Sequence, residues 1–233
     1  MPESVSSLDP IQLEHWEEGL CLASGGYYPE RTRLEDFEHQ AVPLPASLQG
    51  AVEKRLAEYL AGRCCARAAI EAITREPALP GYGEDRAPVW PQAVCGAITH
   101  AQGRAAALVA DRRRWRGVGL DAEAWIAPQR ALKLREQLLT EAEIEALSDL
   151  DQEQQARRVS LTFSVKEALF KALYPLTGQR FYFQDAALLD DHRIVLRTTL
   201  SDEWLTGVAL DYQWREQNGG VLSWILVARS GGE

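Results

Sequence analysis

Two long helical patterns, each flanked by strand-like segments, constrain the fold of this chain more than any other feature. Between residues 44 and 73, apolar and basic residues recur at three- and four-residue steps. A second long helix is predicted from Gln152 to Leu173, ending before Pro175. The order strand, helix, strands and then strand, helices, strands predicts an α+β fold of two halves, each a helix on an antiparallel sheet.

Turn residues delimit the predicted strands. A Gly-Gly turn ends the strand expected within residues 19–28, and Asn218-Gly219-Gly220 supplies the turn of the last hairpin. Thr140 is predicted to cap a further helix, because Glu143 follows three residues later. The other strands are expected at residues 93–99 and 104–110, joined by a turn at 100–103, and at 117–123, 186–189, 194–198, 208–214 and 221–227.

The predicted boundary between the halves lies near residues 115–117. We therefore expect an N-terminal domain at residues 1–116 and a C-terminal domain at 117–233. Because ligands favour clefts between such halves, the active site is expected in the cleft between them.

Charge and hydropathy exclude several classes of function. The 233-residue chain has a net charge of −9, which argues against a broad nucleic-acid surface. It has no apolar run of membrane-spanning length, and residues 1–9 lack the pattern of a secretory leader. Its four cysteines have no metal-binding spacing, so we expect free thiols and a cytoplasmic protein that acts away from membranes.

The segment 118–123, here called the acidic strand, carries the first chemical signal. With strand alternation, Val118 and Leu120 share one face, whereas Gly119, Asp121 and Glu123 share the other. Two neighbouring carboxylates on one face suit Mg²⁺, which takes oxygen ligands. A half-buried strand whose wet face is acidic by composition is the alternative.

The segment 163–173, here called the Lys-Glu helix, carries the second signal. Glu167 and Lys171 lie four residues apart, opposite an apolar stripe, with Lys166 to one side. Phe170 falls on the polar side, which favours a site. A surface Glu–Lys pair is the alternative. Together the two segments offer three carboxylates for a metal and two ammonium groups for phosphate charge.

Three further motifs complete a recognisable order. Gly96-Ala-Ile-Thr99-His100 follows an arginine-bearing helix at 61–69 and a basic residue, Arg86, shortly before Trp90-Pro91. With the acidic strand and the Lys-Glu helix, these resemble the motifs of Sfp-type 4'-phosphopantetheinyl transferases, in the enterobactin synthase component D-like branch. Ala97 departs from the pattern, because the family has serine there.

The resemblance implies an α/β pseudodimer with the coenzyme A site between its halves. It implies transfer of 4'-phosphopantetheine from coenzyme A to a serine of an acyl, peptidyl or aryl carrier protein, with release of 3',5'-ADP. Such holo-[acyl-carrier-protein] synthase activity serves fatty-acid or enterobactin-like siderophore biosynthesis. We expect a monomer that uses Mg²⁺ or Mn²⁺ and has coenzyme A and carrier domains, not nucleic acid, as partners.

The resemblance also assigns residues to roles. Asp121, Glu123 and Glu167 would hold the metal, and Glu167, or a water that it orients, is the candidate base for the carrier serine. Lys166 and Lys171 are candidates for the pyrophosphate. The predicted catalytic residues are therefore Asp121, Glu167 and Lys171.

Coenzyme A contacts are expected in the N-terminal half. An alternative for Arg55, Arg63 and Arg67 is a solvated basic stripe paired with Glu53, Glu58 and Glu71. An alternative for His100 is a hydrogen bond to nearby backbone. Arginine suits the 3'-phosphate because it makes bidentate phosphate contacts. The predicted contacts are Arg55, Arg63, Arg67, Arg86, Thr99 and His100.

Two other functions fit the same residues. A different Mg²⁺-dependent phosphotransferase or pyrophosphate hydrolase would use these carboxylates and lysines on another acceptor. A non-catalytic coenzyme A-binding or scaffold protein would use the acidic cluster only structurally. A Walker or Rossmann nucleotide site is excluded, because neither glycine-rich spacing occurs.

Overall fold

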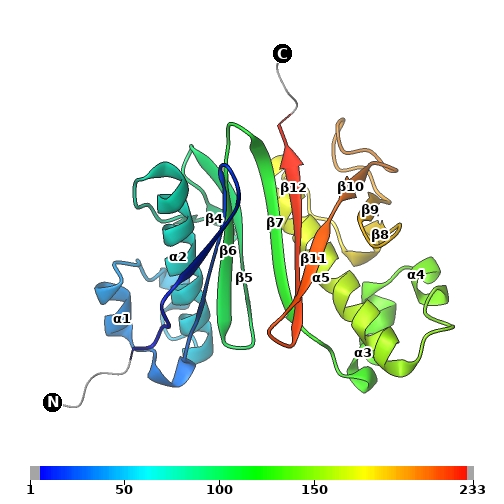
Figure 1. The fold of residues 1–233 in the computed structure, drawn as a ribbon, viewed down its shortest axis with the longest axis horizontal. Coiled ribbons are helices and arrows are strands. Elements are labelled where there is room, and N and C mark those ends of the chain that lie inside the picture. The colour runs from blue at the N-terminus through cyan, green and yellow to red at the C-terminus, as the bar shows by residue number, and fades with distance from the viewer. Residues whose placement is uncertain (1–5, 230–233) are drawn as a thin grey trace. The chain divides into compact units, whose positions relative to one another are not determined.

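The computed structural model describes residues 6–229 and divides the chain into two compact units. One unit runs up to Arg116 and also takes in Arg229, and the other is Gly117–Ala228. Both combine helices with antiparallel sheets, as Figure 1 shows, so the predicted α+β class is confirmed.

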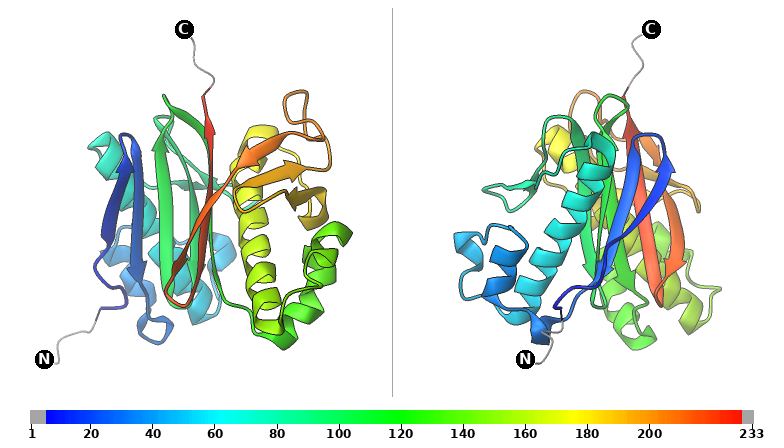
Figure 2. Two further views of the ribbon diagram at one scale, coloured as in Figure 1. Left: turned by 45° about the vertical axis from the view of Figure 1, so that its right-hand side comes forward. Right: turned by 60° about the vertical axis from the view of Figure 1, so that its left-hand side comes forward.

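The first unit is built on a four-stranded antiparallel sheet, and helix α2 (Glu53–Thr74) packs against its strands β2, β5 and β6. In Figure 2, right, this helix crosses one face of the sheet. The strand order is β1 (Gln12–Glu17), β2 (Leu20–Gly26), β6 (Arg104–Asp111) and β5 (Val94–Ala101). Smaller elements are α1 (Leu34–His39), β3 (Gly81–Tyr82), β4 (Pro88–Val89) and the 3₁₀ turns η1 (Pro29–Arg31) and η2 (Ala46–Leu48).

Helix α2 begins at Glu53, so the predicted start near residue 44 is wrong. Pro45 precedes a single 3₁₀ turn, and Gly50 adopts a positive φ of 81°, which interrupts a regular helix. The apolar periodicity upstream arises because Leu44 packs against buried residues of α1 and α2 and Leu48 is buried in the turn η2.

The second unit places helix α5 (Gln152–Thr177) against strand β12 (Gly220–Ala228). In its sheet β12 lies between β11 (Gln213–Gln217) and β7 (Trp115–Ala124). A separate antiparallel sheet has the order β10-β9-β8, with bounds Ala209–Asp211, Arg193–Leu196 and Ala186–Leu188. The turn η3 (Phe183–Asp185) precedes β8, and helices α3 (Pro128–Leu138) and α4 (Glu141–Glu145) precede α5.

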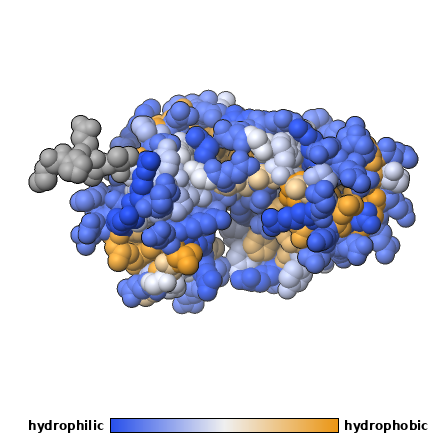
Figure 3. Space-filling view, turned by 90° about the horizontal axis from the view of Figure 1, so that it is seen from below, coloured by the Kyte–Doolittle hydropathy of each residue, from blue (hydrophilic) through white to orange (hydrophobic). Residues whose placement is uncertain are grey.

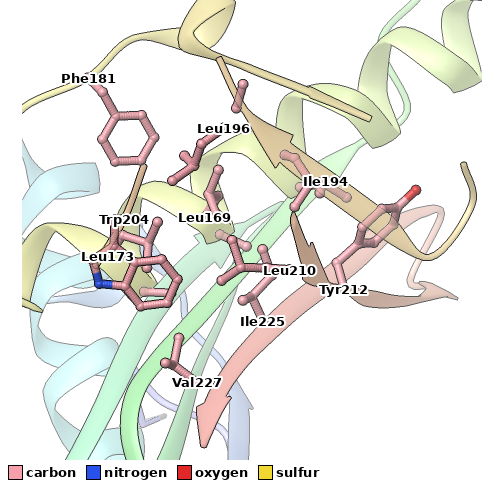
Figure 4. Close-up of a cluster of buried hydrophobic side chains, with 14 of the residues drawn as sticks. Leu169, Leu173, Phe181, Ile194, Leu196, Trp204, Leu210, Tyr212, Ile225 and Val227 are labelled. Carbon is pink, nitrogen blue, oxygen red and sulfur yellow. The ribbon is translucent and has the colours of Figure 1, made fainter. Parts of the chain in front are cut away.

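The core of the second unit lies between α5 and these two sheets. Leu169 and Leu173 of α5 are fully buried against Ile225 of β12 and Ile194 of β9. Figure 4 shows these side chains converging, with Trp204 and Phe181 at the edge of the cluster. The predicted apolar stripe of the Lys-Glu helix is therefore its core face.

Helix α5 continues past Pro175, so the predicted end before this proline is wrong. Proline cannot donate a hydrogen bond to the carbonyl of Lys171, four residues earlier, which weakens the last turn. Leu176 packs against the core and offsets part of that loss. The helix ends where Gly178 takes the left-handed conformation, φ 66°, and its N–H bonds to the carbonyl of Tyr174 at 2.8 Å.

The strand predictions were incomplete in the first unit and shifted in the second. Strand β1 is missed, because its charged residues lack an apolar alternation. His100 lies inside β5, paired with Ala105, and the turn is confined to residues 102–103. The segment predicted at 208–214 is two strands, β10 and β11.

Glycine lets β7 approach α5 closely. A Cβ built on Gly119 would lie 1.8 Å from the carbonyl oxygen of Ala168, and one on Gly117 would lie 2.9 Å from that of Ala172. No larger residue fits at Gly119 without moving the strand from the helix. This approach fixes the position of the acidic strand against the Lys-Glu helix.

Within residues 6–229, no helix is long and apolar enough to cross a membrane. The face shown in Figure 3 is largely hydrophilic, with separate hydrophobic patches. The four cysteines are buried and free, as predicted.

Gly119→Ala tests this close approach. Its methyl group would overlap a backbone oxygen, so we expect a loss of about 3 kcal/mol in the free energy of unfolding, measured by denaturant titration. Gly178→Ala is the control, because open space surrounds that position and only its positive φ is strained, at about 1 kcal/mol. An equal or larger loss in the control would contradict the account.

Candidate active site

The acidic strand and the Lys-Glu helix meet in the second unit, through β7 and α5. Asp121 is 4 % exposed, and Lys171 Nζ donates to its Oδ1 at 2.7 Å. The same ammonium donates to the carbonyl of Leu120 at 3.1 Å. Lys171 therefore joins α5 to β7 at Asp121, the first of the predicted metal-binding carboxylates in the chain.

Two buried serines hold β7 in register with its neighbours. Ser164 Oγ of α5 donates to the carbonyl of Asp121 at 3.3 Å and lies 2.7 Å from Ser223 Oγ of β12. All three residues are buried. Sequence reasoning missed both serines, because a small residue within an apolar pattern indicates only core packing.

The carboxylates share one electrostatic environment. Burial, followed by the charge of Asp121, raises the pKa of Glu123 to about 7; Lys171 and Arg130 oppose the shift and Glu167 adds to it. Burial is also the main cause that raises the pKa of Glu167, where Lys171 opposes and Asp121 adds. The charges of Asp121, Glu123 and Glu167 thus repel one another, and the ammonium of Lys171 offsets only part of this repulsion.

The chemistry of this donor set fits Mg²⁺, a hard cation that takes oxygen ligands. Within the described part of the chain, no three His, Cys, Asp or Glu side chains are arranged to hold a metal by themselves. Mg²⁺ is usually bound by one or two carboxylates, with water and substrate phosphate oxygens completing its shell. The residues therefore suit a cation that arrives with a phosphate-bearing substrate.

Lys166 is placed differently from its prediction. The sequence assigns it to pyrophosphate, whereas the structure buries its ammonium, which donates to Glu143 Oε2 at 2.7 Å and to the carbonyl of Leu138 at 2.9 Å. Glu143 also accepts from the backbone N–H of Thr140 and of Leu188, so Glu143 and Lys166 together connect α3, α4, α5 and β8. A contact between Lys166 and phosphate would require this ion pair to open.

Phe170 also has a structural partner that the helical wheel did not predict. Its ring lies 5.4 Å from that of Phe181 and stacks on Tyr174 at 5.1 Å between centroids. Phe170 also packs against the core of this unit, so its place on the polar side of the helical wheel does not by itself indicate a site. A hollow of about 230 Å³ opens beside Glu167, lined by Lys166, Glu167, Phe170, Arg180, Phe181, Tyr182, Phe183 and Ala186.

In the first unit, the structure brings together Arg55 and His100. Arg55 Nη1 lies 3.5 Å from His100 Nε2, and both side chains remain partly exposed. Thr99 is buried, and strand alternation directs it to the opposite face of β5 from His100. Ala97, which replaces the family serine, lies on the same face as Thr99.

Arg63 and Arg67 bond to backbone elsewhere in this unit. Arg63 is 4 % exposed, and its Nη1 donates to the carbonyls of Pro80, at 2.9 Å, and Gly81, at 3.1 Å. Burial is the main cause that lowers its pKa. Arg67 donates to the backbone and side-chain oxygens of Gln40. Both arginines secure loops beside α2, and the predicted basic face is not a single cluster.

Arg86 lies in a tight turn next to the strand that Arg63 secures. Its φ is 71°, its N–H bonds to the carbonyl of Gly83 at 2.9 Å, and its side chain is exposed. The turn closes with Gly83 N–H donating to the carbonyl of Ala87. Arg86 is thus available to an anion from outside.

Comparison with known proteins assigns the family. Residues 38–110 match the 4'-phosphopantetheinyl transferase N-terminal domain, and residues 117–221 match the 4'-phosphopantetheinyl transferase superfamily. The second match contains the acidic strand, the Lys-Glu helix and their carboxylates.

Named relatives agree with this match. The 4'-phosphopantetheinyl transferase Svp of Streptomyces mobaraensis is 35% identical over 80% of this chain and 78% of its own. The transferase Npt of Nocardia iowensis is 34% identical over 68% and 67%. Enterobactin synthase component D of Escherichia coli (strain K12) is 37% identical over 56% and 61%.

The chain therefore belongs to the 4'-phosphopantetheinyl transferase superfamily. The resemblance to Sfp-type transferases drawn from its motifs is confirmed. Its reaction moves the phosphopantetheine of coenzyme A to a carrier protein.

The buried Lys166–Glu143 pair yields a stability prediction. Lys166→Met removes the cation and leaves Glu143 buried without it, so we expect a loss of about 3 to 5 kcal/mol in unfolding free energy. Arg157→Met is the control, because its 2.7 Å pair with Glu216 is exposed and is worth about 1 kcal/mol or less. Similar losses in the two variants would contradict a structural role for Lys166.

Glu123 yields a pH prediction. Its pKa is raised from an ordinary 4.5 to about 7, so between these values the folded protein binds more protons than the unfolded chain. Its contribution to stability is therefore greatest below pH 4.5 and is lost as pH rises through 7. In metal-free buffer, wild-type unfolding free energy should fall more steeply across this window than that of Glu123→Gln. Parallel profiles would show that this carboxyl group is not perturbed.

Proposed function

We propose that the carboxylates and lysine of the second unit carry out Mg²⁺-dependent transfer of phosphopantetheine from coenzyme A to a carrier serine. The observation that carries this proposal is the Lys171–Asp121 contact, which joins strand and helix beside two further carboxylates with raised pKa. Such a site combines cation ligands, a phosphate-binding ammonium and a base.

Asp121, Glu123 and Glu167 are proposed to hold Mg²⁺, or Mn²⁺, together with oxygens of the substrate. When bound, the metal neutralises negative charge that develops on the phosphate. Lys171 reaches the same place, because its side chain is 26 % exposed while its ammonium already lies at Asp121. We assign the pyrophosphate contact to Lys171. Lys166 can contact the pyrophosphate only if its ion pair with Glu143 opens.

Glu167 is proposed as the base that takes the proton of the carrier serine. Burial raises its pKa, which makes this carboxylate a stronger base than one in water. The serine oxygen then forms a bond to the phosphorus next to pantetheine, and the bond to 3',5'-ADP breaks. Phosphoryl chemistry of this kind depends mainly on positioning and electrostatics.

The hollow beside Glu167 is proposed to take the pantetheine arm. That arm begins at the phosphorus under attack, so it must leave from the region of Glu167 and Lys171. The aromatic rings of Phe170 and Phe181 offer apolar contact, and Arg180 at the wall can donate to the amide carbonyls of the arm.

The first unit is proposed to bind the 3'-phosphate and adenosine. Arg55 and His100 form a pair of basic side chains, and Arg86 can add a further donor from its exposed turn. Arg63 and Arg67 would contribute by holding the adjoining loops, and Thr99 from the other face of β5. That the two units form a pseudodimer around one coenzyme A stays a prediction.

Acyl, peptidyl or aryl carrier domains are the proposed partners. Several relatives are named enterobactin synthase component D, which favours carriers of siderophore-type peptide synthesis alongside those of fatty-acid synthesis. We propose action in the cytoplasm as a monomer.

Glu167→Gln tests the assignment of the base. The amide keeps the shape but cannot take a proton, so we expect turnover to fall about 100-fold or more. Coenzyme A affinity, measured by calorimetry with Mg²⁺, should change much less. Asp121→Asn is the comparison, because loss of a metal ligand should reduce both.

The two readouts separate the roles. Equal losses of binding and turnover in Glu167→Gln would assign it to the metal alone. Full activity in Asp121→Asn, with folding confirmed by circular dichroism, would contradict the proposed site.

A further inference from the structure

A buried glutamate, Glu58 of α2, lies among basic side chains of α2 and β5. The Glu58 side chain is only 10 % exposed, and three basic side chains surround it. Its Oε2 lies 3.7 Å from Arg55 Nη1, and its Oε1 lies 3.6 Å from His100 Nδ1 and 3.9 Å from Lys54 Nζ. Lys54 and Arg55 come from the preceding helical turn, whereas His100 comes from β5.

Glu58 bridges two basic side chains that lie further out. The side chains of Arg55 and His100 are 46 % and 36 % exposed, and Arg55 Nη1 approaches His100 Nε2 to 3.5 Å. Because arginine can only donate, this contact is a hydrogen bond when the ring nitrogen of His100 accepts. One carboxylate oxygen of Glu58 faces each of the two side chains, so Glu58 restrains both in one arrangement.

The distances leave Arg55 able to bind a further anion. Tight charge-assisted hydrogen bonds measure about 2.7 to 2.9 Å, shorter than either contact with Glu58. Arg55 carries five N–H donors in a planar fork, so most remain for an incoming phosphate.

We propose that Glu58 is a positioning residue that holds Arg55 and His100 as a preformed pair for the 3'-phosphate of coenzyme A. The inference rests on the proposed function, which assigns that phosphate to Arg55 and His100. Glu58 does not bind the phosphate itself, because both are anions. It acts through Arg55 and His100, by removing the cost of ordering them when the substrate binds.

Positioning and simple electrostatics predict opposite results when the charge is removed. A carboxylate near a phosphate repels it, so on electrostatic grounds alone Glu58→Gln should bind coenzyme A more tightly. If Glu58 positions Arg55 and His100, the same variant should bind coenzyme A more weakly. The effect should vanish for a donor that lacks the 3'-phosphate.

The experiment compares coenzyme A with 3'-dephospho-coenzyme A, in calorimetric binding and as donors in the transfer assay. In Glu58→Gln we expect affinity for coenzyme A to fall about tenfold, the cost of ordering one or two side chains. Affinity for the dephospho donor and kcat for coenzyme A should be unchanged. Glu58→Asp, which keeps the charge, should restore part of the preference, and exposed Glu71→Gln on the same helix is the control.

Each other outcome overturns a distinct claim. Tighter or equal binding of coenzyme A by Glu58→Gln would overturn the positioning role. An equal loss for both donors would also overturn it, by showing that Glu58 supports only the fold. If wild type itself does not distinguish the donors, the assignment of the 3'-phosphate to Arg55 and His100 fails, and the inference fails with it.

Discussion

The close approach of β7 to α5 is the constraint on which the proposed active site depends. Gly119 leaves room for the carbonyl of Ala168, and the buried hydroxyls of Ser164 and Ser223 fix the register of the contact. Because the strand lies against the helix, Asp121 comes within hydrogen-bonding distance of Lys171. A bulkier residue at Gly119 would separate the two motifs that form the site.

Charge is distributed unevenly once these elements are in place. One ammonium, that of Lys171, offsets Asp121, while burial leaves Glu123 and Glu167 with raised pKa values. This imbalance is the basis on which we propose that the site binds a divalent cation and that Glu167 acts as the base. In the first unit the balance is reversed, because the single carboxylate of Glu58 faces Lys54, Arg55 and His100. The proposed cation site thus has an excess of carboxylates, and the proposed phosphate site has an excess of basic side chains.

Local patterns predicted the parts of this arrangement that depend on periodicity. Alternation placed Gly119 on one face of the strand with Asp121, and the helical stripe identified the core face of α5. Partners distant in the chain could not be predicted. The capping box of Glu143 is complete in itself, so nothing local indicated that Lys166 would join it. Likewise, arginines at helical spacing predicted a shared face, but Arg63 and Arg67 bond to loops whose paths the sequence does not define.

The intact mass of an apo carrier protein, incubated with this protein, coenzyme A and Mg²⁺, tests the central claim most directly. The account predicts a gain of one phosphopantetheine, which is lost when EDTA is added or when the carrier serine is replaced by alanine. A gain that persists in EDTA would contradict the metal role of the carboxylates. No gain on carriers of either fatty-acid or peptide synthesis, despite measured coenzyme A binding, would contradict the assignment of the reaction to this site.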